Sequence, residues 1–357
     1  MKLIDKYIIK RYLGTFSIMI MLFIPIGIMV DIAEKIDKFK ENEVPVDALI
    51  NYYIDFTWYF ANLLFPIFLF LSVIWFTSKL ANNTEVTAIL SSGISFNRFI
   101  RPFMISALFI AIVTFLMGMF IVPKSNKGFN EFSFKYLKKK GERNTNYVFK
   151  QISNDEYIYV SSYNPIRKRA NNFTLEKFKN QQMIIKINAE SIRWIPKDSI
   201  FRLTSFKKRV FNGDNEILQK AIYKDTIFDF RIQDLAPVNY KAETLTMFQL
   251  NDFINEEKKN GSILINSHLL TRHKRYSLPL ASFILTLIAV SMSSNKRRGG
   301  MGVNLAIGIS LGFLFIFFDK IFGVMVTKSN FSPFFGAWLP LIIFGVISLL
   351  LLNYAKR

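Results

Sequence analysis

Cysteine is absent from this chain of 357 residues, and histidine occurs only twice, as His268 and His273. A chain without thiols forms no disulfide, no Cys-ligated zinc site and no cysteine nucleophile. The two histidines lie among basic neighbours and lack a nearby carboxylate that could complete a metal site. A G-x-x-x-x-G-K-[ST] phosphate-binding loop is missing as well. We therefore predict no metal, no cofactor and no catalytic group in this chain.

Charged residues make up 20% of the chain but are missing from six stretches, each at least 19 residues long. An α-helix rises ~1.5 Å per residue and needs about 20 apolar residues to cross a ~30 Å hydrocarbon core. The stretches therefore predict six transmembrane helices and exclude an ordinary soluble enzyme or a disordered chain. They cover residues 12–30, 56–78, 102–123, 276–295, 299–318 and 329–355.

Lysine and arginine in the short loops predict how these helices are oriented. One set of helix ends carries 12 basic residues, including the run Lys296–Arg298, and the other set carries 5. The richer side faces the cytoplasm, so both termini are expected there and the insert 124–275 lies outside. The insert has a net charge of +13, but long segments translocate largely regardless of charge. The basic amino terminus is typical of a signal peptide, yet stretch 12–30 is too long and lacks a cleavage pattern, so we expect it to be retained.

The external insert changes to short runs in which apolar and polar residues alternate, separated by Asn, Asp, Gly and Pro. This pattern predicts antiparallel strands in a sandwich, barrel or jelly roll. The runs are 157–160, 173–178, 183–190, 199–204 and 226–230. A helix-like basic stretch at 132–140 precedes them, and Thr246 with Gln249 forms a capping-box pattern that predicts a connector helix.

Four regions follow from these observations. Residues 1–123 form the first transmembrane half, and residues 124–245 form an inserted, jelly-roll-like antiparallel β domain. Residues 246–275 contain the connector helix and a linker. Residues 276–357 form the second transmembrane half.

One polar segment on the cytoplasmic side predicts a short helix at about 84–93. Thr84 can cap its amino end, and Glu85 then lies at the positive end of the helix dipole. Gly93 suits a left-handed carboxyl-terminal stop. Three residues, Val86, Ile89 and Leu90, give the helix an apolar side.

The fifth apolar stretch carries features that point to helix packing. Gly308 and Gly312 form a small-xxx-small pattern, which allows another helix to approach closely. Asp319 and Lys320 follow near its outer end. We expect them either to pair with each other at the interface or to face a cavity between subunits.

Basic clusters predominate on the predicted external face. Lys35, Lys38 and Lys40 follow the first helix, and Lys138–Lys140, Arg167–Arg169 and Lys207–Arg209 lie in the insert. They indicate either a solvated surface or a site for an anionic, phosphate-bearing ligand. Nucleic acid is not expected, because the clusters lie on the predicted external side of the membrane and no nucleic-acid motif is present.

Together these motifs resemble the lipopolysaccharide export permease family, LptF/LptG. The resemblance covers the three-plus-three layout of helices with its β-rich insert. The motifs that carry it are Ile4–Tyr7, Glu85–Ser95, Ile187–Glu190 with Arg193 and Trp194, Gly308–Gly323 and Gly336–Pro340. They do not distinguish an LptF-like from an LptG-like chain.

The resemblance implies a non-enzymatic permease subunit of an ATP-driven ABC transporter in the bacterial inner membrane. Such a subunit pairs with a homologous permease and with two copies of a cytosolic ATPase, which holds the ATP and magnesium. It extracts lipopolysaccharide and passes it through the periplasmic β domain to a bridge that leads to the outer membrane. The helix after Thr84 matches the family's coupling helix, in which Glu85 contacts a basic residue of the ATPase; the coupling residues are Glu85, Val86, Ile89, Leu90 and Gly93.

The same resemblance implies where substrate is met. Basic residues near the outer end of the first helix contact lipid phosphates in the family, and Lys35, Lys38 and Lys40 lie there. A β domain that passes acyl chains needs a dry lane between strands, although an ordinary sandwich core has the same pattern. The candidate lane residues are Ile158, Val160, Ile185, Ile187, Ile192 and Trp194.

Two alternatives use the same layout. The β domain can belong to a sensor or scaffold that binds a ligand and signals inward. A stand-alone secondary transporter is the other, and it would depend on Asp319 and require no ATPase.

Overall fold

The computed structural model describes the chain in two compact units. It covers residues 2–356 except 138–144, 154, 165–166, 181, 197, 213–214, 231–240, 260, 263 and 296–299. The first unit contains residues 1–132, 243–250 and 266–357, and the second contains 133–242 and 251–265. The predicted basic runs Lys138–Lys140 and Lys296–Arg298 lie outside the described residues.

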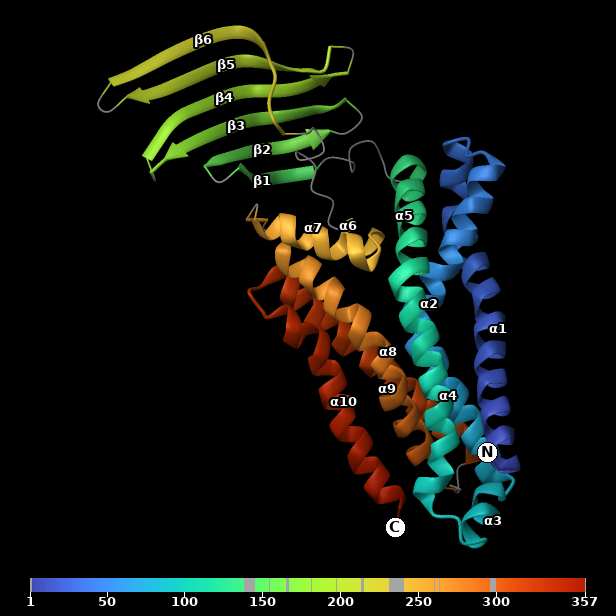
Figure 1. Cartoon of the computed structure of the whole chain (residues 1–357). Helices are drawn as coiled ribbons and strands as arrows, with labels where there is room; N and C mark the ends of the chain where they lie inside the picture. Colours follow the sequence, from blue (N-terminus) through green and yellow to red (C-terminus); the bar gives the residue numbers. More distant parts are fainter. Residues whose placement is uncertain are drawn as a thin grey trace. The chain divides into compact units, whose positions relative to one another are not determined.

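The first unit is a bundle of long helices (Figure 1). In the part of the chain that the structure describes, six helices are long and apolar enough to cross a membrane, as the charge-free stretches predict. One of them runs without a break through α4, the π-helical turn η1 and α5. The helices of this unit are α1 (Leu3–Glu41), α2 (Val46–Asn82), α3 (Glu85–Ser91), α4 (Phe96–Leu116), η1 (Met117–Ile121), α5 (Val122–Phe132), α8 (Ile265–Ser293), α9 (Gly300–Lys328) and α10 (Pro333–Ala355).

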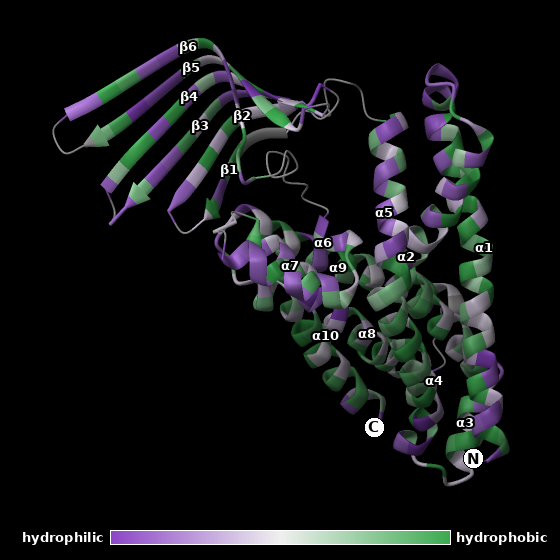
Figure 2. Cartoon of the chain, turned by 45° about the horizontal axis from the view of Figure 1, so that its top comes forward, coloured by the Kyte–Doolittle hydropathy of each residue, from purple (hydrophilic) through white to green (hydrophobic). Residues whose placement is uncertain are grey.

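Several of these helices extend well beyond their apolar stretches. The 39 residues of α1 make a helix of ~59 Å. Figure 2 shows hydrophobic residues along the middle of the long helices and hydrophilic residues towards their ends. Helix α8 begins at Ile265, within the segment 246–275 that is predicted to contain the connector helix and a linker. Polar residues exclude this first part of α8 from hydrocarbon but do not prevent a helix, so the charge pattern marks the membrane and not the helix start.

The core of the first unit lies among α2, α4 and α8, with the first turns of α1 packed against it. In α8, 67% of the most apolar window is buried, and in α2 the share is 56%. The corresponding shares are only 11% in α1 and 17% in α9. These two helices therefore present most of their apolar surface outward.

The second unit contains a six-stranded antiparallel sheet, as the alternating pattern predicts (Figure 1). Its described strands pair in sequence order, so the sheet is a meander and shows none of the crossing connections of a jelly roll. The strands are β1 (Thr145–Ser153), β2 (Glu156–Asn164), β3 (Arg169–Lys179), β4 (Gln182–Ile195), β5 (Ile200–Asn212) and β6 (Asn215–Thr226). Two short helices follow, α6 (Lys241–Thr244) and α7 (Met247–Lys259), and each contributes residues to both units.

The strand expected at 226–230 is wrong, because β6 ends at Thr226. The next residues bring two phenylalanines back onto the apolar face of the sheet. Phe228 and Phe230 lie 5.7 Å and 6.0 Å from the ring of Phe173, centroid to centroid. Alternation in this segment therefore reflects burial against the sheet and not pairing within it.

The apolar face stays continuous because the strands reverse their pleat partway along. In β3 the buried residues Ala170 and Phe173 are three positions apart, and Asn172 between them has a φ of +50°. In β5 the same spacing separates Leu203 from Phe206, with Ser205 at +54°. A left-handed residue shifts the alternation by one position, so side chains on both sides of it reach the same face.

Candidate functional site

The short helix α3 lies between the membrane helices that contain α2 and α4, as the sequence predicts. Gly93, two residues after its end, has a φ of +83°, which matches the expected left-handed stop. The expected side-chain cap by Thr84 is wrong. Thr84 has a φ of +63°, and its hydroxyl donates to the carbonyl of Asn83 at 2.6 Å. Thr84 takes the left-handed conformation in the turn that follows α2. Its hydroxyl therefore points to the preceding peptide and not to the amides of α3.

The apolar side of α3 faces its own chain. Val86 is 2% exposed and belongs to the core of the helical unit, and Ile89 and Leu90 pack against that core as half-buried residues. Thr87 and Ala88 are exposed on the opposite side. Val86 therefore anchors α3 to the membrane helices, and the surface that α3 offers to another molecule is its polar side with the edges of Ile89 and Leu90.

Glu85, the first residue of α3, is held by two donors. The Tyr7 hydroxyl donates to one carboxylate oxygen at 3.1 Å, and the side-chain amide of Asn83 donates to the other at 3.2 Å. The carboxylate remains half-buried at the surface. It is thus oriented by its own chain while it stays within reach of an incoming cation.

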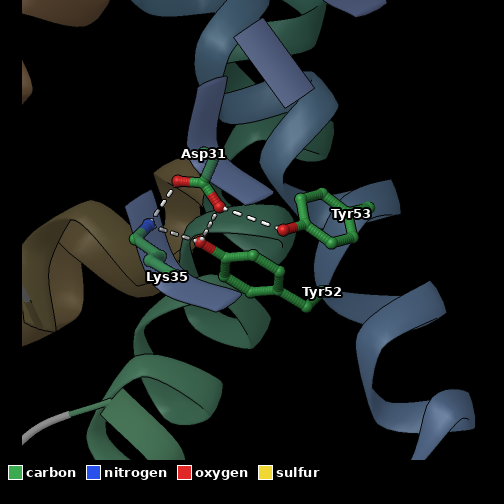
Figure 3. Close-up of polar contacts among 4 residues, drawn as sticks. All are labelled: Asp31, Lys35, Tyr52 and Tyr53. Carbon is green, nitrogen blue, oxygen red and sulfur yellow. Dashed lines mark hydrogen bonds and ion pairs between the residues drawn. The ribbon is translucent and has the colours of Figure 1, made fainter. Parts of the chain in front are cut away.

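A polar cluster joins the outer parts of α1 and α2 (Figure 3). Lys35 forms an ion pair with Asp31, one turn earlier, and its ammonium donates to the Tyr52 hydroxyl at 2.8 Å. Tyr52 and Tyr53 both donate to the same Asp31 oxygen, at 3.0 Å and 3.3 Å. Lys35 also lies 5.8 Å from the ring centroid of Phe129, within cation–π range.

This cluster shows that the three basic candidates on α1 are not equivalent. Lys35 is satisfied by a buried carboxylate and aromatic rings, whereas Lys38 and Lys40 are exposed. Sequence reasoning missed Asp31 and Tyr52. The i, i+4 spacing of Asp31 and Lys35 was the available signal, because such residues share one face of a helix.

A cavity of about 310 Å³ is lined by residues of α2, α4, η1, α5, α6, α8 and α9. Glu243, Lys274, Arg275, Asp319 and Lys320 supply its charged lining. Asp319 accepts a hydrogen bond from Lys274 at 2.7 Å, so the expected pairing of Asp319 with Lys320 is wrong. Consecutive residues of a helix point about 100° apart, which directs Asp319 towards α8. The cavity lies within this one chain.

The returning segment at Glu243 is fixed to the same cavity. Asn126 of α5 donates to the Glu243 carbonyl at 3.4 Å, and Arg275 of α8 donates to the Leu245 carbonyl at 2.6 Å. Burial raises the pKa of the Glu243 carboxyl, and the positive charges of Lys320, Lys274 and Arg275 oppose that shift. The charge of the Glu243 carboxyl therefore interacts with the charges of all three basic residues in the cavity.

The two glycines of α9 face another helix of the same chain. A Cβ added to Gly308 would collide with the side chain of Ile74 on α2, and one added to Gly312 would lie 3.5 Å from the Phe70 ring. The small-residue face therefore lets α9 pack closely on α2. Whether these glycines also serve a partner subunit stays a prediction.

The candidate lane residues of the β domain divide into two groups. Ile158, Val160 and Ile192 are at most 1% exposed and form the core of the sheet's apolar face. Ile187 and Trp194 are half-buried against that core, and Ile185 is half-buried near the start of β4. The structure thus places most of them on one apolar face, and their contact with an acyl chain stays a prediction.

Comparison with known proteins agrees with this architecture. A sequence model of the family described as "Lipopolysaccharide export system permease LptF/LptG" matches residues 6–354. The lipopolysaccharide export system permease protein LptG of Escherichia coli K12 is 19% identical over 352 residues, which cover 98% of this chain and 97% of that protein. LptG of Escherichia coli O6:H1 strain CFT073 matches to the same extent. The chain belongs to the LptF/LptG family and is a multi-pass membrane protein.

Proposed function

We propose that this family member is the permease subunit of an ATP-driven transporter that extracts lipopolysaccharide from the inner membrane. The observation that carries the proposal is the family match over nearly the whole chain, combined with the short helix α3 that is anchored to the membrane helices by buried Val86. The positive-inside pattern puts α3 and both termini in the cytoplasm and the β domain in the periplasm. ATP and magnesium belong to a separate cytosolic ATPase dimer.

α3 is the coupling element in this proposal. A helix of 7 residues that is wedged between α2 and α4 moves as a rigid body with them, because Val86 is buried among both. Its acidic first residue and exposed polar side suit a groove with a basic residue on a soluble partner. Motion imposed by ATP binding then reaches the membrane helices through α3.

Lys38 and Lys40 are the basic residues that meet the anionic substrate in this proposal. Both are exposed near the outer end of α1, where a lipid phosphate can approach. Lys35 supports the site indirectly by holding α1 against α2 through Asp31 and Tyr52. The apolar face of the sheet then offers acyl chains a path away from the membrane.

A homologous permease and a periplasmic bridge protein complete the proposed assembly. The exposed apolar surfaces of α1 and α9 support a second permease, since both helices bury little within this chain. The edge strand β6 is the proposed docking site for the bridge protein, which would add a strand to the sheet there. Its side chains Ile217, Leu218, Ile222 and Tyr223 are all at least 45% exposed.

Replacing Glu85 by lysine tests the proposed function. The reversed charge should repel the basic residue of the ATPase, so less ATPase should co-purify in mild detergent and lipopolysaccharide release should fall. Asp47→Lys is the control, because Asp47 is an exposed acid in the first turn of α2, at the opposite end of that helix from α3. Mass spectrometry of the purified complex identifies bound proteins and lipids. Unchanged ATPase binding and export in Glu85→Lys would overturn the proposal.

The same purification separates the alternatives. A sensor or scaffold would co-purify with no ATPase. A stand-alone transporter would move substrate as a single purified chain without ATP, and Asp319→Asn would abolish that transport.

A further inference from the structure

The amino end of α1 is bound to the beginning of α4 by a two-point ion pair. The Arg98 guanidinium donates to both carboxylate oxygens of Asp5, at 2.8 Å and 2.7 Å. The side chain of Asp5 is only 8% exposed, and it also accepts a hydrogen bond from the backbone of Lys2 at 2.9 Å. A two-point pair between planar groups fixes orientation as well as distance.

A second contact joins α1 to the coupling helix itself. The Tyr7 hydroxyl donates to Glu85, and the Tyr7 ring meets Phe76 of α2 edge-on at 6.5 Å between centroids. The Arg11 guanidinium lies 5.7 Å from the centroid of this ring. The ring is thus positioned by packing, and its hydroxyl contacts α3 through Glu85.

These contacts are concentrated at one end of α1. Asp5, Ile8 and Tyr12 are buried on one face, and the Tyr12 hydroxyl forms a hydrogen bond with Thr286 at 2.7 Å. Beyond this face the apolar part of α1 is largely exposed, with 11% of its most apolar window buried. The described polar contacts between α1 and the other helices then resume only at Asp31 and Lys35.

We propose that Asp5 and Tyr7 form a clamp that makes α1 follow α3 when the ATPase moves the coupling helix. The proposal rests on the proposed function, in which α3 receives that movement. Apolar contacts let a loosely packed helix slide, whereas a two-point ion pair and a directed hydrogen bond hold it in register. Asp5, Tyr7 and Arg98 are positioning residues in this scheme, because they act through α1 and α3 and do not touch nucleotide.

The clamp predicts a separation of ATP hydrolysis from transport. In the complete complex in liposomes, Asp5→Asn and Tyr7→Phe should bind the ATPase normally and keep most hydrolysis. Lipopolysaccharide release per ATP should fall about tenfold in Asp5→Asn, since a hydrogen bond to a charged group contributes about that factor, and less in Tyr7→Phe. Tyr354→Phe is the control, because Tyr354 is 73% exposed near the end of α10.

A covalent link between positions 5 and 98 tests whether the Asp5–Arg98 pair transmits movement or only stabilises the fold. The chain has no native cysteine, so Asp5→Cys with Arg98→Cys provides its only thiols, and a short bismaleimide cross-linker can join them before the complex is assembled. Cross-linking should restore release per ATP in this variant. The charge-swapped pair Asp5→Arg with Arg98→Asp should also recover part of it.

Three outcomes decide the proposal. Export that stays normal in Asp5→Asn, or hydrolysis and export that fall in proportion, would overturn the clamp. Failure of cross-linking to raise release per ATP in a well-folded, ATPase-bound variant would overturn it too. If Glu85→Lys leaves assembly and export intact, the proposed function itself fails, and that result does not depend on the clamp variants.

Discussion

At the scale of single residues, identical side chains have different roles because their surroundings differ. Three lysines close together on α1 look equivalent in the sequence, yet Lys35 is paired with a buried carboxylate while Lys38 and Lys40 are exposed. A lysine that neutralises a buried aspartate contributes to stability. A lysine in water is available to an anionic ligand.

Lys35→Met should therefore destabilise the fold, and Lys38→Met with Lys40→Met should not. The first change leaves Asp31 buried without its cation, at a cost of about 2 kcal/mol. Thermal unfolding in detergent measures the difference, and retained lipopolysaccharide, quantified by mass spectrometry, should fall in the double variant. Adding Asp31→Asn to Lys35→Met should recover part of the lost stability. Equal melting temperatures for Lys35→Met and the double variant would contradict this division.

Glu243 predicts a dependence of stability on pH. Burial raises the pKa of its carboxyl above the ordinary value of 4.5, so the folded state holds its proton more tightly than the unfolded state. Its contribution is complete below that ordinary value and is lost as the pH rises through the folded pKa. Relative to Glu243→Gln, the wild-type melting temperature should fall as the pH is raised from about 4.5. Parallel pH profiles of the two proteins would show that Glu243 does not titrate in this way.

At the scale of elements, the close contact between α9 and α2 depends on a missing side chain. Gly308→Leu should destabilise the bundle by about 1–3 kcal/mol, because the new side chain overlaps Ile74. Gly302→Leu is the matched control in the same helix, since nothing lies within 4 Å of a Cβ added there. Thermal unfolding of both variants measures the difference. Adding Ile74→Ala to Gly308→Leu should relieve part of the effect, and equal destabilisation by the two leucines would refute the packing argument.

The connector helix α7 shows how much of an element is visible in sequence. Thr246 with Gln249 indicates its start, and the structure places both the Thr246 backbone amide and its hydroxyl on the Gln249 side-chain oxygen, at 3.1 Å and 3.0 Å. Its later residues belong to the unit that contains the sheet, where Glu257 lies 3.7 Å from Lys150 of β1. The start of α7 follows from local chemistry. Which unit its first and its later residues pack against depends on tertiary contacts.

At the scale of the whole molecule, the sheet has two edges that differ in length and in surface. Among the strands that the structure describes, the twelve residues of β6 pair with β5 alone, and β1 forms the opposite edge. An exposed edge strand with apolar side chains is a template for a strand of another protein.

Ile222→Lys should therefore weaken binding of a periplasmic bridge protein while the complex with the ATPase still forms. Ile222 is 76% exposed, so the change should leave the fold of the sheet intact. Phe149→Lys on β1, where Phe149 is 47% exposed, is the control at the other edge. Co-purification from membranes measures both associations. Loss of bridge binding in Phe149→Lys but not in Ile222→Lys would contradict the prediction, because it would place the bridge protein at β1 and not at β6.

The sequence by itself determined the six membrane helices, the inserted antiparallel sheet and the position of the short helix α3. Each of these depends on patterns that a single segment carries: missing charge, alternation, a glycine stop. Only the tertiary structure decided that Asp319 pairs with Lys274, that Tyr52 joins the Asp31–Lys35 pair and that Asp5 and Arg98 meet across 93 residues. The reason is physical: partners far apart in sequence are brought together by helix packing, and local patterns contain no information about which faces pack.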